Sequence, residues 1–236
     1  MTGQCASPLL AESLTTRPVS PLEPLVQGQR NTPAQVENAS LLMNNKTIRQ
    51  EIREQRNKLS HEQRLEASIA VSEAITNHPF FMRARNIALY LSNDGEIDIS
   101  PVFETAWQRG KRCYLPVLSP KGKKLSFAPY TAESTMRNNR YGIPEPVVSQ
   151  RTLLTPQQLN LVLTPLVAFD GKGNRIGMGG GYYDRSFAFL RRQQHFKQTR
   201  LCGIGFHFQQ VDAIKEQDWD VPLFGAFTDK GAIQFK

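Results

Sequence analysis

The feature that most constrains this chain is a glycine-rich segment at residues 170–185, which reads DGKGNRIGMGGGYYDR and contains six glycines. The preceding apolar run Leu159–Thr164 predicts a buried strand, and a helix is predicted from Tyr183 to Gln193. Glycine lets the backbone approach an anion and point several N–H groups at it, and the start of a helix adds free N–H groups and a positive dipole end. The unit therefore predicts a phosphate cradle at Gly177–Gly181.

This segment matches neither of the common nucleotide-binding patterns. No Gly-Lys-Ser/Thr triplet closes it as in a P-loop, and its spacing differs from the dinucleotide GxGxxG motif. Arg175 lies inside the segment and can neutralise a phosphate. Asp184, at its end, is suited to hold a magnesium ion that bridges phosphate oxygens, and it is equally suited to cap the helix that begins there.

Two helices are predicted before the first strand. The first begins at Asn44, and its basic residues fall on one stripe: Lys46, Arg49, Arg53 and Arg56. Arg53 and Arg56 could equally form a solvated helix face. Ser60 and Gln63 form a capping box for the second helix, which ends before Pro79. The residues expected on its buried face are Leu65, Ile69, Ala70 and Ile75.

Short apolar strands then alternate with helices. The predicted strands are Asn86–Leu91, Arg112–Leu118, Lys124–Pro129, Leu159–Thr164 and Leu201–Phe206. Ser100, followed by Pro101, is predicted to cap a helix that ends at Gly110. This alternation predicts an α/β fold, with a three-layer, open, mainly parallel sheet, helices on both faces and the N-terminal helical pair.

The first 42 residues differ in composition from the rest of the chain. They contain five prolines and no aromatic residue, so we expect a disordered N-terminal extension. Residues 43–236 are predicted to form a single α/β domain. Met43 stands directly before the first helical pattern, and we consider it a candidate for the true start of the protein.

Charge and cysteine content narrow the class of protein. The net charge is +8, and the extension carries more acidic than basic residues, so the positive charge belongs to the folded part and favours anionic partners. Cys113 and Cys202 lie in apolar runs that are typical of a core, and the three cysteines show no metal-ligand or disulfide spacing. No apolar run approaches the ~18 residues of a membrane span, and no signal peptide is recognisable. We expect a cytoplasmic protein without a membrane partner.

The glycine segment also resembles a known signature. GNRIGMGGGYYDR at 173–185 is similar to the signature of the 5-formyltetrahydrofolate cyclo-ligase family, also called methenyltetrahydrofolate synthetases. Further stretches resemble family motifs in the same order: LSNDGEID at 91–98, RGKRCYLPVL at 109–118, IPEP at 143–146, LVLTPLVAFD at 161–170 and DWDVPL at 218–223. The resemblance runs from about Asn45 to about Leu223.

The resemblance implies an ATP- and Mg²⁺-dependent ligase. It would convert 5-formyltetrahydrofolate to 5,10-methenyltetrahydrofolate and release ADP and phosphate, by phosphorylation of the formyl oxygen and attack of N10. Such a site works mainly by positioning and charge neutralisation, so it needs a phosphate cradle, a metal ion and a folate slot. The implied catalytic residues are Arg175, Tyr182 and Asp184.

The resemblance also implies binding residues. ATP is expected to contact Asn45, Lys46, Arg49, Arg175, Ile176, Gly177, Met178, Gly179, Gly180, Gly181, Tyr182 and Tyr183. The folate is expected to contact Leu91, Glu96, Met178, Gly179, Gly180, Gly181 and Tyr182. Mg²⁺ is expected at Asp184 and Asp218. Many members carry a basic residue where this chain has Asn45, so either Lys46 or Arg49 is the candidate for the phosphate contact.

Other classes of function stay open at this point. A nucleotide-binding protein without catalysis would keep the glycine segment but would not need Asp184. Basic charge also suits nucleic acid, but aromatic residues do not interleave with the basic ones, so we expect no nucleic-acid partner. A sugar-phosphate or acyl-transfer enzyme needs a general base, and His207 is expected to pack at a strand end instead. We expect a monomer or weak dimer that acts on small molecules, including a folate with or without a polyglutamate tail.

Overall fold

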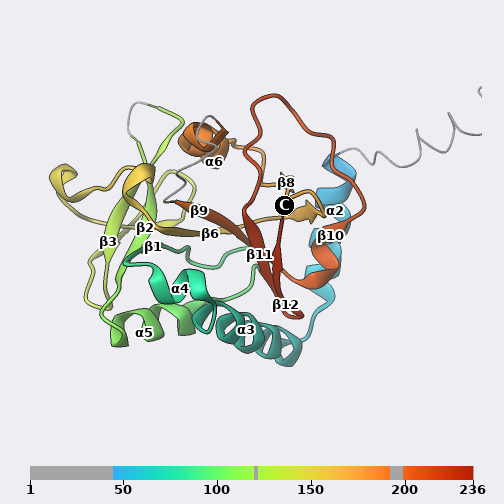
Figure 1. The fold of residues 1–236 in the computed structure, drawn as a ribbon, viewed down its shortest axis with the longest axis horizontal. Coiled ribbons are helices and arrows are strands. Elements are labelled where there is room, and N and C mark those ends of the chain that lie inside the picture. The colour runs from blue at the N-terminus through green and yellow to red at the C-terminus, as the bar shows by residue number, and fades with distance from the viewer. Residues whose placement is uncertain (1–44, 120–121, 192–198, 236) are drawn as a thin grey trace, which may run out of the picture.

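The computed structural model describes residues 45–119, 122–191 and 199–235, and its centre is a seven-stranded sheet in the order β12-β11-β9-β6-β1-β2-β3 (Figure 1). The strands are β1 (Asn86–Ala88), β2 (Arg112–Leu118), β3 (Leu125–Tyr130), β6 (Leu161–Pro165), β9 (Arg200–Ile204), β11 (Gly225–Thr228) and β12 (Gly231–Gln234). The five inner strands pair in parallel, whereas β3 and β12 pair antiparallel at the two edges. The predicted mainly parallel α/β sheet is confirmed.

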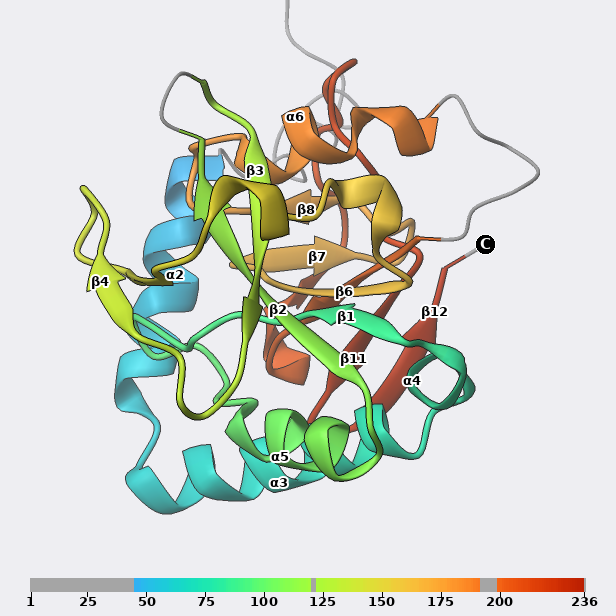
Figure 2. The ribbon, with the colours of Figure 1, turned by 90° about the vertical axis from the view of Figure 1, so that its left-hand side faces the viewer.

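Helices cover both faces of this sheet. On one face lie α3 (His61–Thr76), α4 (Pro79–Arg83) and α5 (Ser100–Gln108). On the other face lie α6 (Tyr182–Phe187) and the 3-10 helix η3 (Ala188–Arg191), as Figure 2 shows. The arrangement gives the three layers that the sequence predicts.

Helix α2 (Asn45–Lys58) packs on a second, smaller sheet. This sheet has the order β10-β7-β8, formed by β10 (Gln210–Val211), β7 (Ala168–Asp170) and β8 (Arg175–Ile176). Ile48 and Ile52 of α2 pack in one buried cluster with Ala168 and Ile176. The two N-terminal helices are both present, but α2 and α3 bury their apolar faces against different sheets.

The remaining elements are short. A two-stranded hairpin consists of β4 (Met136–Asn138) and β5 (Pro144–Pro146). The other 3-10 helices are η1 (Gln150–Thr152), η2 (Pro156–Gln158) and η4 (His207–Gln209). Among the helices of the described ranges, none has the length and apolar character that crossing a bilayer requires.

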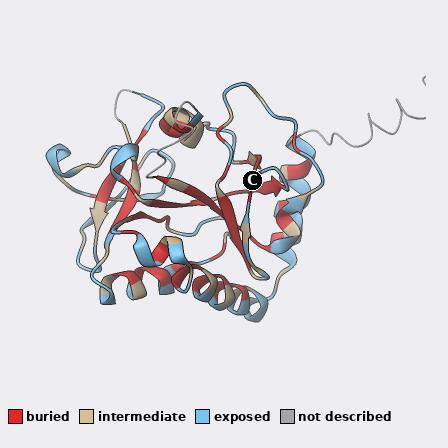
Figure 3. Ribbon diagram, viewed as in Figure 1, coloured by how far each residue is buried: buried red, intermediate tan, exposed pale blue. Residues whose placement is uncertain are grey.

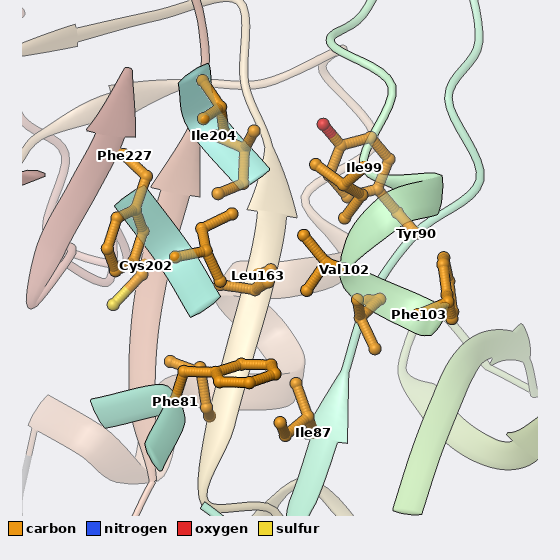
Figure 4. Packing of buried hydrophobic residues seen from close by; sticks show 14 of the residues in the cluster. Phe81, Ile87, Tyr90, Ile99, Val102, Phe103, Leu163, Cys202, Ile204 and Phe227 are labelled. Carbon is orange, nitrogen blue, oxygen red and sulfur yellow. The ribbon is translucent and has the colours of Figure 1, made fainter. Parts of the chain in front are cut away.

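The strands of the central sheet consist largely of buried residues (Figure 3), and clusters of buried apolar side chains lie on both of its faces. The cluster under α3, α4 and α5 includes Phe81, Ile87, Val102 and Leu163, which interlock in Figure 4. The cluster under α6 includes Phe127, Phe169, Phe187 and Leu190. Cys113 and Cys202 are buried in the first cluster, and burial raises the pKa of each thiol to about 12. Both cysteines are therefore unreactive core residues, as predicted.

The buried face of α3 differs from the prediction. The Ser60 capping box is present and Ile75 is buried, but Leu65 and Ile69 are 52% and 48% exposed, and Ala70 is only partly buried. The buried face instead consists of Ala67, Ser68, Val71, Ser72, Ile75 and Thr76. Four of these side chains are small or hydroxylated, which lets the helix lie close to β11 and β12.

Three element boundaries also differ. Strand β1 ends at Ala88, earlier than the predicted Leu91. Ser100 is the first residue of α5 and does not cap it, since the cap position is Ile99. The helix predicted to reach Gln193 is divided into α6 and η3, and its predicted end lies outside the described residues, as does the extension 1–42.

Candidate functional site

Within the glycine segment, residues 177–181 join β8 to α6. Gly179 and Gly181 have φ values of 91° and 60°, which glycine adopts without strain. Gly181 is the N-cap of α6 and provides no capping side chain, so Asp184 lies inside the first turn and is not the cap. The hydroxyl of Tyr183 interacts with Thr164, near the carboxyl end of β6.

Arg175 and Asp184 form an ion pair at the base of this segment. Nη2 of Arg175 donates to Oδ1 of Asp184 at 2.6 Å, and Nη1 donates to the carbonyl of Val221. The backbone N–H of Val221 also donates to Oδ1 of Asp184, at 3.3 Å. The side chain of Arg175 is 6% exposed and that of Asp184 is 21% exposed. The pair therefore ties the residues on both sides of the Gly177–Gly181 loop to the chain around Val221.

Two further acids, Asp218 and Asp220, lie just before Val221 in the sequence. Asp218 is exposed, and Arg191 donates to its backbone carbonyl. The pKa of Asp220 is raised, first by burial and also by the negative charge of Asp184. The structure thus brings Asp220, which the sequence reasoning missed, into electrostatic contact with Asp184. Asp218 and Asp220 both belong to the DWDVPL motif at 218–223, so the motif that indicated Asp218 also contained Asp220.

The carboxylates of Asp184 and its neighbour suit Mg²⁺, which prefers hard oxygen ligands and is often bound by one or two carboxylates together with substrate phosphates. Within the described residues, no group of three or more acidic, histidine or cysteine side chains is placed to hold a metal ion. A site with two carboxylates is consistent with a metal that takes its remaining ligands from a phosphate substrate and water.

Helix α2 brings its basic stripe to the glycine segment. Nε of Arg49 donates to the carbonyl of Gly177 at 2.8 Å, and Nη1 of Arg49 donates to the carbonyl of Asn45 at 3.4 Å. A surface groove of about 330 Å³ runs along the same helix and is lined by Lys46, Arg49, Gln50, Arg53, Glu54 and Asn57. Positive charge is therefore held beside the loop in which the phosphate cradle is predicted.

Glu96 lies in a tight turn that follows β1. The backbone N–H of Glu96 donates to the carbonyl of Asn93 at 3.0 Å, and the N–H of Asn93 donates to Oε2 of Glu96 at 3.1 Å. Asp94 and Gly95 between them have φ values of 51° and 73°. These contacts hold the Glu96 carboxylate at the carboxyl end of the strand, which is where open α/β sheets bind ligands.

Burial raises the pKa of Glu96 from its ordinary value of 4.5 to about 7. The hydrogen bond from Asn93 and the positive charge of Arg56 oppose this rise. Glu96 also interacts electrostatically with Tyr90 and Tyr183, and burial raises the pKa of both tyrosines. Glu96 therefore lies near Tyr183, which belongs to the glycine segment.

The hydroxyl of Tyr182 contacts the tip of the β4–β5 hairpin. It accepts a hydrogen bond from Nη2 of Arg140 at 2.8 Å and lies 3.0 Å from the hydroxyl of Tyr141. The hydrogen bond with Tyr141 lowers the pKa of Tyr182. Sequence reasoning missed Arg140 and Tyr141, for which the adjacent IPEP motif was the available signal. Of the other residues expected to contact the folate, Met178 is 60% exposed, whereas Leu91 is partly buried and packs against the core.

Comparison with known proteins gives concordant matches. The profile of the 5-formyltetrahydrofolate cyclo-ligase family matches residues 42–229. The Haemophilus influenzae protein named 5-formyltetrahydrofolate cyclo-ligase is 42% identical over 178 residues, which are 75% of this chain and 93% of the relative. The Escherichia coli K12 protein of the same name is 40% identical over 173 residues, 73% of this chain and 93% of the relative.

A solved structure agrees with these relatives. The NMR structure of Aquifex aeolicus 5,10-methenyltetrahydrofolate synthetase is similar with a TM-score of 0.68 and 28% sequence identity. The match covers 82% of this chain and 94% of that protein.

Proposed function

This chain belongs to the 5-formyltetrahydrofolate cyclo-ligase family and is a ligase, and from that premise we propose the reaction it catalyses. ATP and 5-formyltetrahydrofolate become 5,10-methenyltetrahydrofolate, ADP and phosphate. The supporting observation is that helix α2 contacts both the glycine segment, through Arg49 and Gly177, and the turn that carries Glu96, through Arg56 and Asp94. The reaction needs this combination of a phosphate-binding loop and a folate-binding carboxylate.

The phosphates of ATP bind between the glycine segment and α2. Backbone N–H groups of Gly177–Gly181 surround the phosphate oxygens, and Lys46 and Arg49 supply positive charge from the helix. Arg175 acts mainly from behind the loop, because its guanidinium group is buried against Asp184 and Val221. Asn45 lies at the start of α2, where its backbone carbonyl already orients Arg49.

Mg²⁺ fits beside Asp184, with a second carboxylate from Asp218 or Asp220. A bound Mg²⁺ would neutralise negative charge on the phosphate oxygens during transfer. The electrostatic contact between Asp220 and Asp184 favours Asp220 as the second acid. The exposed side chain of Asp218 is the weaker candidate.

The folate is held so that its formyl oxygen faces the γ-phosphate. Glu96 accepts hydrogen bonds from the amino group and ring N–H of the pterin, Leu91 lines the slot, and the Met178–Tyr182 edge contacts the reacting end. The formyl oxygen attacks the γ-phosphorus, and the bond to the bridging oxygen breaks to release ADP. N10 then attacks the formyl carbon and loses its proton to solvent, and the C–O bond breaks to release phosphate.

An assay of the purified protein tests the proposal. With ATP, Mg²⁺ and 5-formyltetrahydrofolate, the near-ultraviolet absorbance of the methenyl product should grow with time. Asp184→Asn should lower kcat by about 100-fold, because it removes the negative charge proposed to hold Mg²⁺ while keeping an acceptor for Arg175. Glu73→Gln, an exposed acid on α3, is the matched control and should leave kcat unchanged. Absence of product with the wild-type protein would overturn the proposal.

A further inference from the structure

We propose that Arg56 is a positioning residue for folate binding: its buried guanidinium group holds the turn that carries Glu96 and favours the anionic form of the Glu96 carboxylate, which accepts hydrogen bonds from the pterin. The inference rests on the proposed role of Glu96 as the folate-binding acid. It goes beyond that role, because Arg56 belongs to none of the recognised motifs.

Burial distinguishes Arg56 from its neighbours on the basic stripe. The side chain of Arg56 is 1% exposed, whereas that of Arg53, one turn earlier, is 50% exposed. Within the described residues, Nε of Arg56 has no hydrogen-bond partner. A buried guanidinium group is costly unless negative charge lies near it, so its surroundings should explain its place in the fold.

The first negative neighbour is Asp94, in the turn before Glu96. Nη2 of Arg56 lies 3.4 Å from Oδ2 of Asp94, and Nη2 of Arg53 lies 3.0 Å from Oδ1. Asp94 has a φ of 51°, which is uncommon for a residue other than glycine. Each of the two arginines of α2 thus contacts one carboxylate oxygen of Asp94, the residue that shapes the turn.

The second negative neighbour is Glu96 itself. The negative charge of Glu96 acts on Arg56 more strongly than that of Asp94. The other groups that interact with Glu96 are Asp94, from the same turn, Tyr90, which follows β1, and Tyr183 from α6. Arg53 and Arg64 act on Arg56.

Within this set, Arg56 is the cation that favours the ionised form of Glu96. Burial and Asp94 both favour the neutral form. The two tyrosines are uncharged at neutral pH, since burial raises a pKa that ordinarily already lies near 10. The pKa of Glu96 is about 7 with Arg56 in place. Loss of the Arg56 charge should therefore raise it further and leave most Glu96 side chains protonated at neutral pH.

A protonated Glu96 is a poorer acceptor for the pterin donors, so the effect should fall on KM and leave kcat nearly unchanged. In the wild type, KM for 5-formyltetrahydrofolate should rise below about pH 7. Arg56→Met should move this rise to higher pH and raise KM at pH 7 about fivefold or more, as expected for a pKa increase of about one unit. Arg56→Lys keeps the charge and should restore most of the wild-type pH profile.

Two controls separate charge from simple loss of structure. Arg53→Met removes the other, exposed contact to Asp94 and should not shift the pH dependence of KM. In a Glu96→Gln background, Arg56→Met should add no further pH dependence, because the titrating group is gone. If Arg56→Met does not fold, Arg56→Gln carries the same expectation.

A direct measurement keeps this test separate from the proposed reaction. Carbon-13 NMR of labelled protein, with Glu96→Gln used to assign the signal, reports the pKa of the Glu96 carboxyl without any turnover. A higher pKa in Arg56→Met supports the inference even if the wild-type protein fails to form product. An unchanged Glu96 pKa, or a KM effect that Arg56→Lys does not rescue, would overturn it.

Discussion

Glu96 is a side chain whose ionisation the fold moves into the physiological range. Burial raises its pKa from 4.5 to about 7, so between these two pH values the native protein binds more protons than the unfolded chain. The free energy of unfolding should therefore decrease as pH rises through this window, and the destabilisation is fully present above pH 7. The fold contains this acid at a cost to stability, which its proposed role in folate binding would explain.

Glu96→Gln should relieve that cost. We expect the variant to have a higher Tm than the wild type at pH 8, and the difference should vanish as pH falls towards 4.5, where the native Glu96 is protonated. Thermal unfolding at pH 5 and pH 8 measures the effect. Glu104→Gln, an exposed acid on α5, serves as the control and should show no such pH-dependent gain. Equal Tm values for Glu96→Gln and wild type at pH 8 would contradict the explanation.

Substitution of Asp218 and of Asp220 should affect the Mg²⁺ requirement differently. Asp220 interacts with Asp184, whereas Asp218 is exposed, so Asp220→Asn should raise the Mg²⁺ concentration needed for half-maximal turnover by about tenfold or more. Asp218→Asn should change it less than about twofold. Titrations of turnover against Mg²⁺ at saturating ATP and folate compare the two variants. A large effect in Asp218→Asn alone would support the assignment made from the sequence.

The sequence predicts which residues lie close together where these residues belong to one continuous motif. Arg175 and Asp184 lie nine positions apart, and their ion pair closes the same segment that identified them. Arg56 and Asp94 are 38 positions apart, and the contact between them depends on how α2 packs against the small sheet. A long-range contact of this kind leaves no local pattern, so the buried role of Arg56 emerged only from the structure.

At the scale of elements, α3 shows why apolar spacing can misplace a face. Its apolar residues surround the helix, so the predicted face combined Leu65 and Ile69, which are exposed, with Ile75, which is buried. The structure buries the stripe with smaller side chains, which allows close contact with β11. The side-chain volume that fits against the neighbouring strands decides which face of α3 is buried. The spacing of apolar residues in the sequence does not report this volume.

Two isoleucines on α3 test this directly. Ile75 is fully buried, so Ile75→Ala should lower the free energy of unfolding by about 2–5 kcal/mol, through lost burial and a cavity. Ile69 is 48% exposed, so Ile69→Ala should change it by no more than about 0.5 kcal/mol. Urea denaturation of the two variants at one pH provides the comparison. Similar losses in both would mean that the exposed side of α3 is covered in solution.

Helix α2 connects the two halves of the site. Arg49, in its first half, contacts Gly177 of the glycine segment, and Arg53 and Arg56, in its second half, contact Asp94 of the folate-side turn. A helix rises about 1.5 Å per residue, so the seven positions from Arg49 to Arg56 span about 10 Å. One helix therefore sets the distance between the proposed phosphate end and the proposed pterin end of the site.

For the whole molecule, the parallel sheet explains why distant segments share a site. Parallel strands end at one edge, and the residues after β1 and β6 therefore meet although more than seventy positions separate the strands. The sequence predicted these buried strands because each is an apolar run. It did not predict β7, β8 and β10, which are two or three residues long and too short to show a period, and so the support for α2 was missed.

The role of α2 also defines how much of the chain the enzyme needs. The family profile begins at residue 42, next to the predicted end of the extension. A chain of residues 43–236 should keep kcat/KM within about twofold of the full chain, because it retains every residue placed in the site. A chain of residues 61–236 lacks α2 and should lose turnover, since Arg49 and Arg56 are absent and the apolar surface of Ala168 and Ile176 is uncovered. Turnover assays and circular dichroism of both truncations test this, and loss of activity in the 43–236 chain would show that the extension contributes to the site.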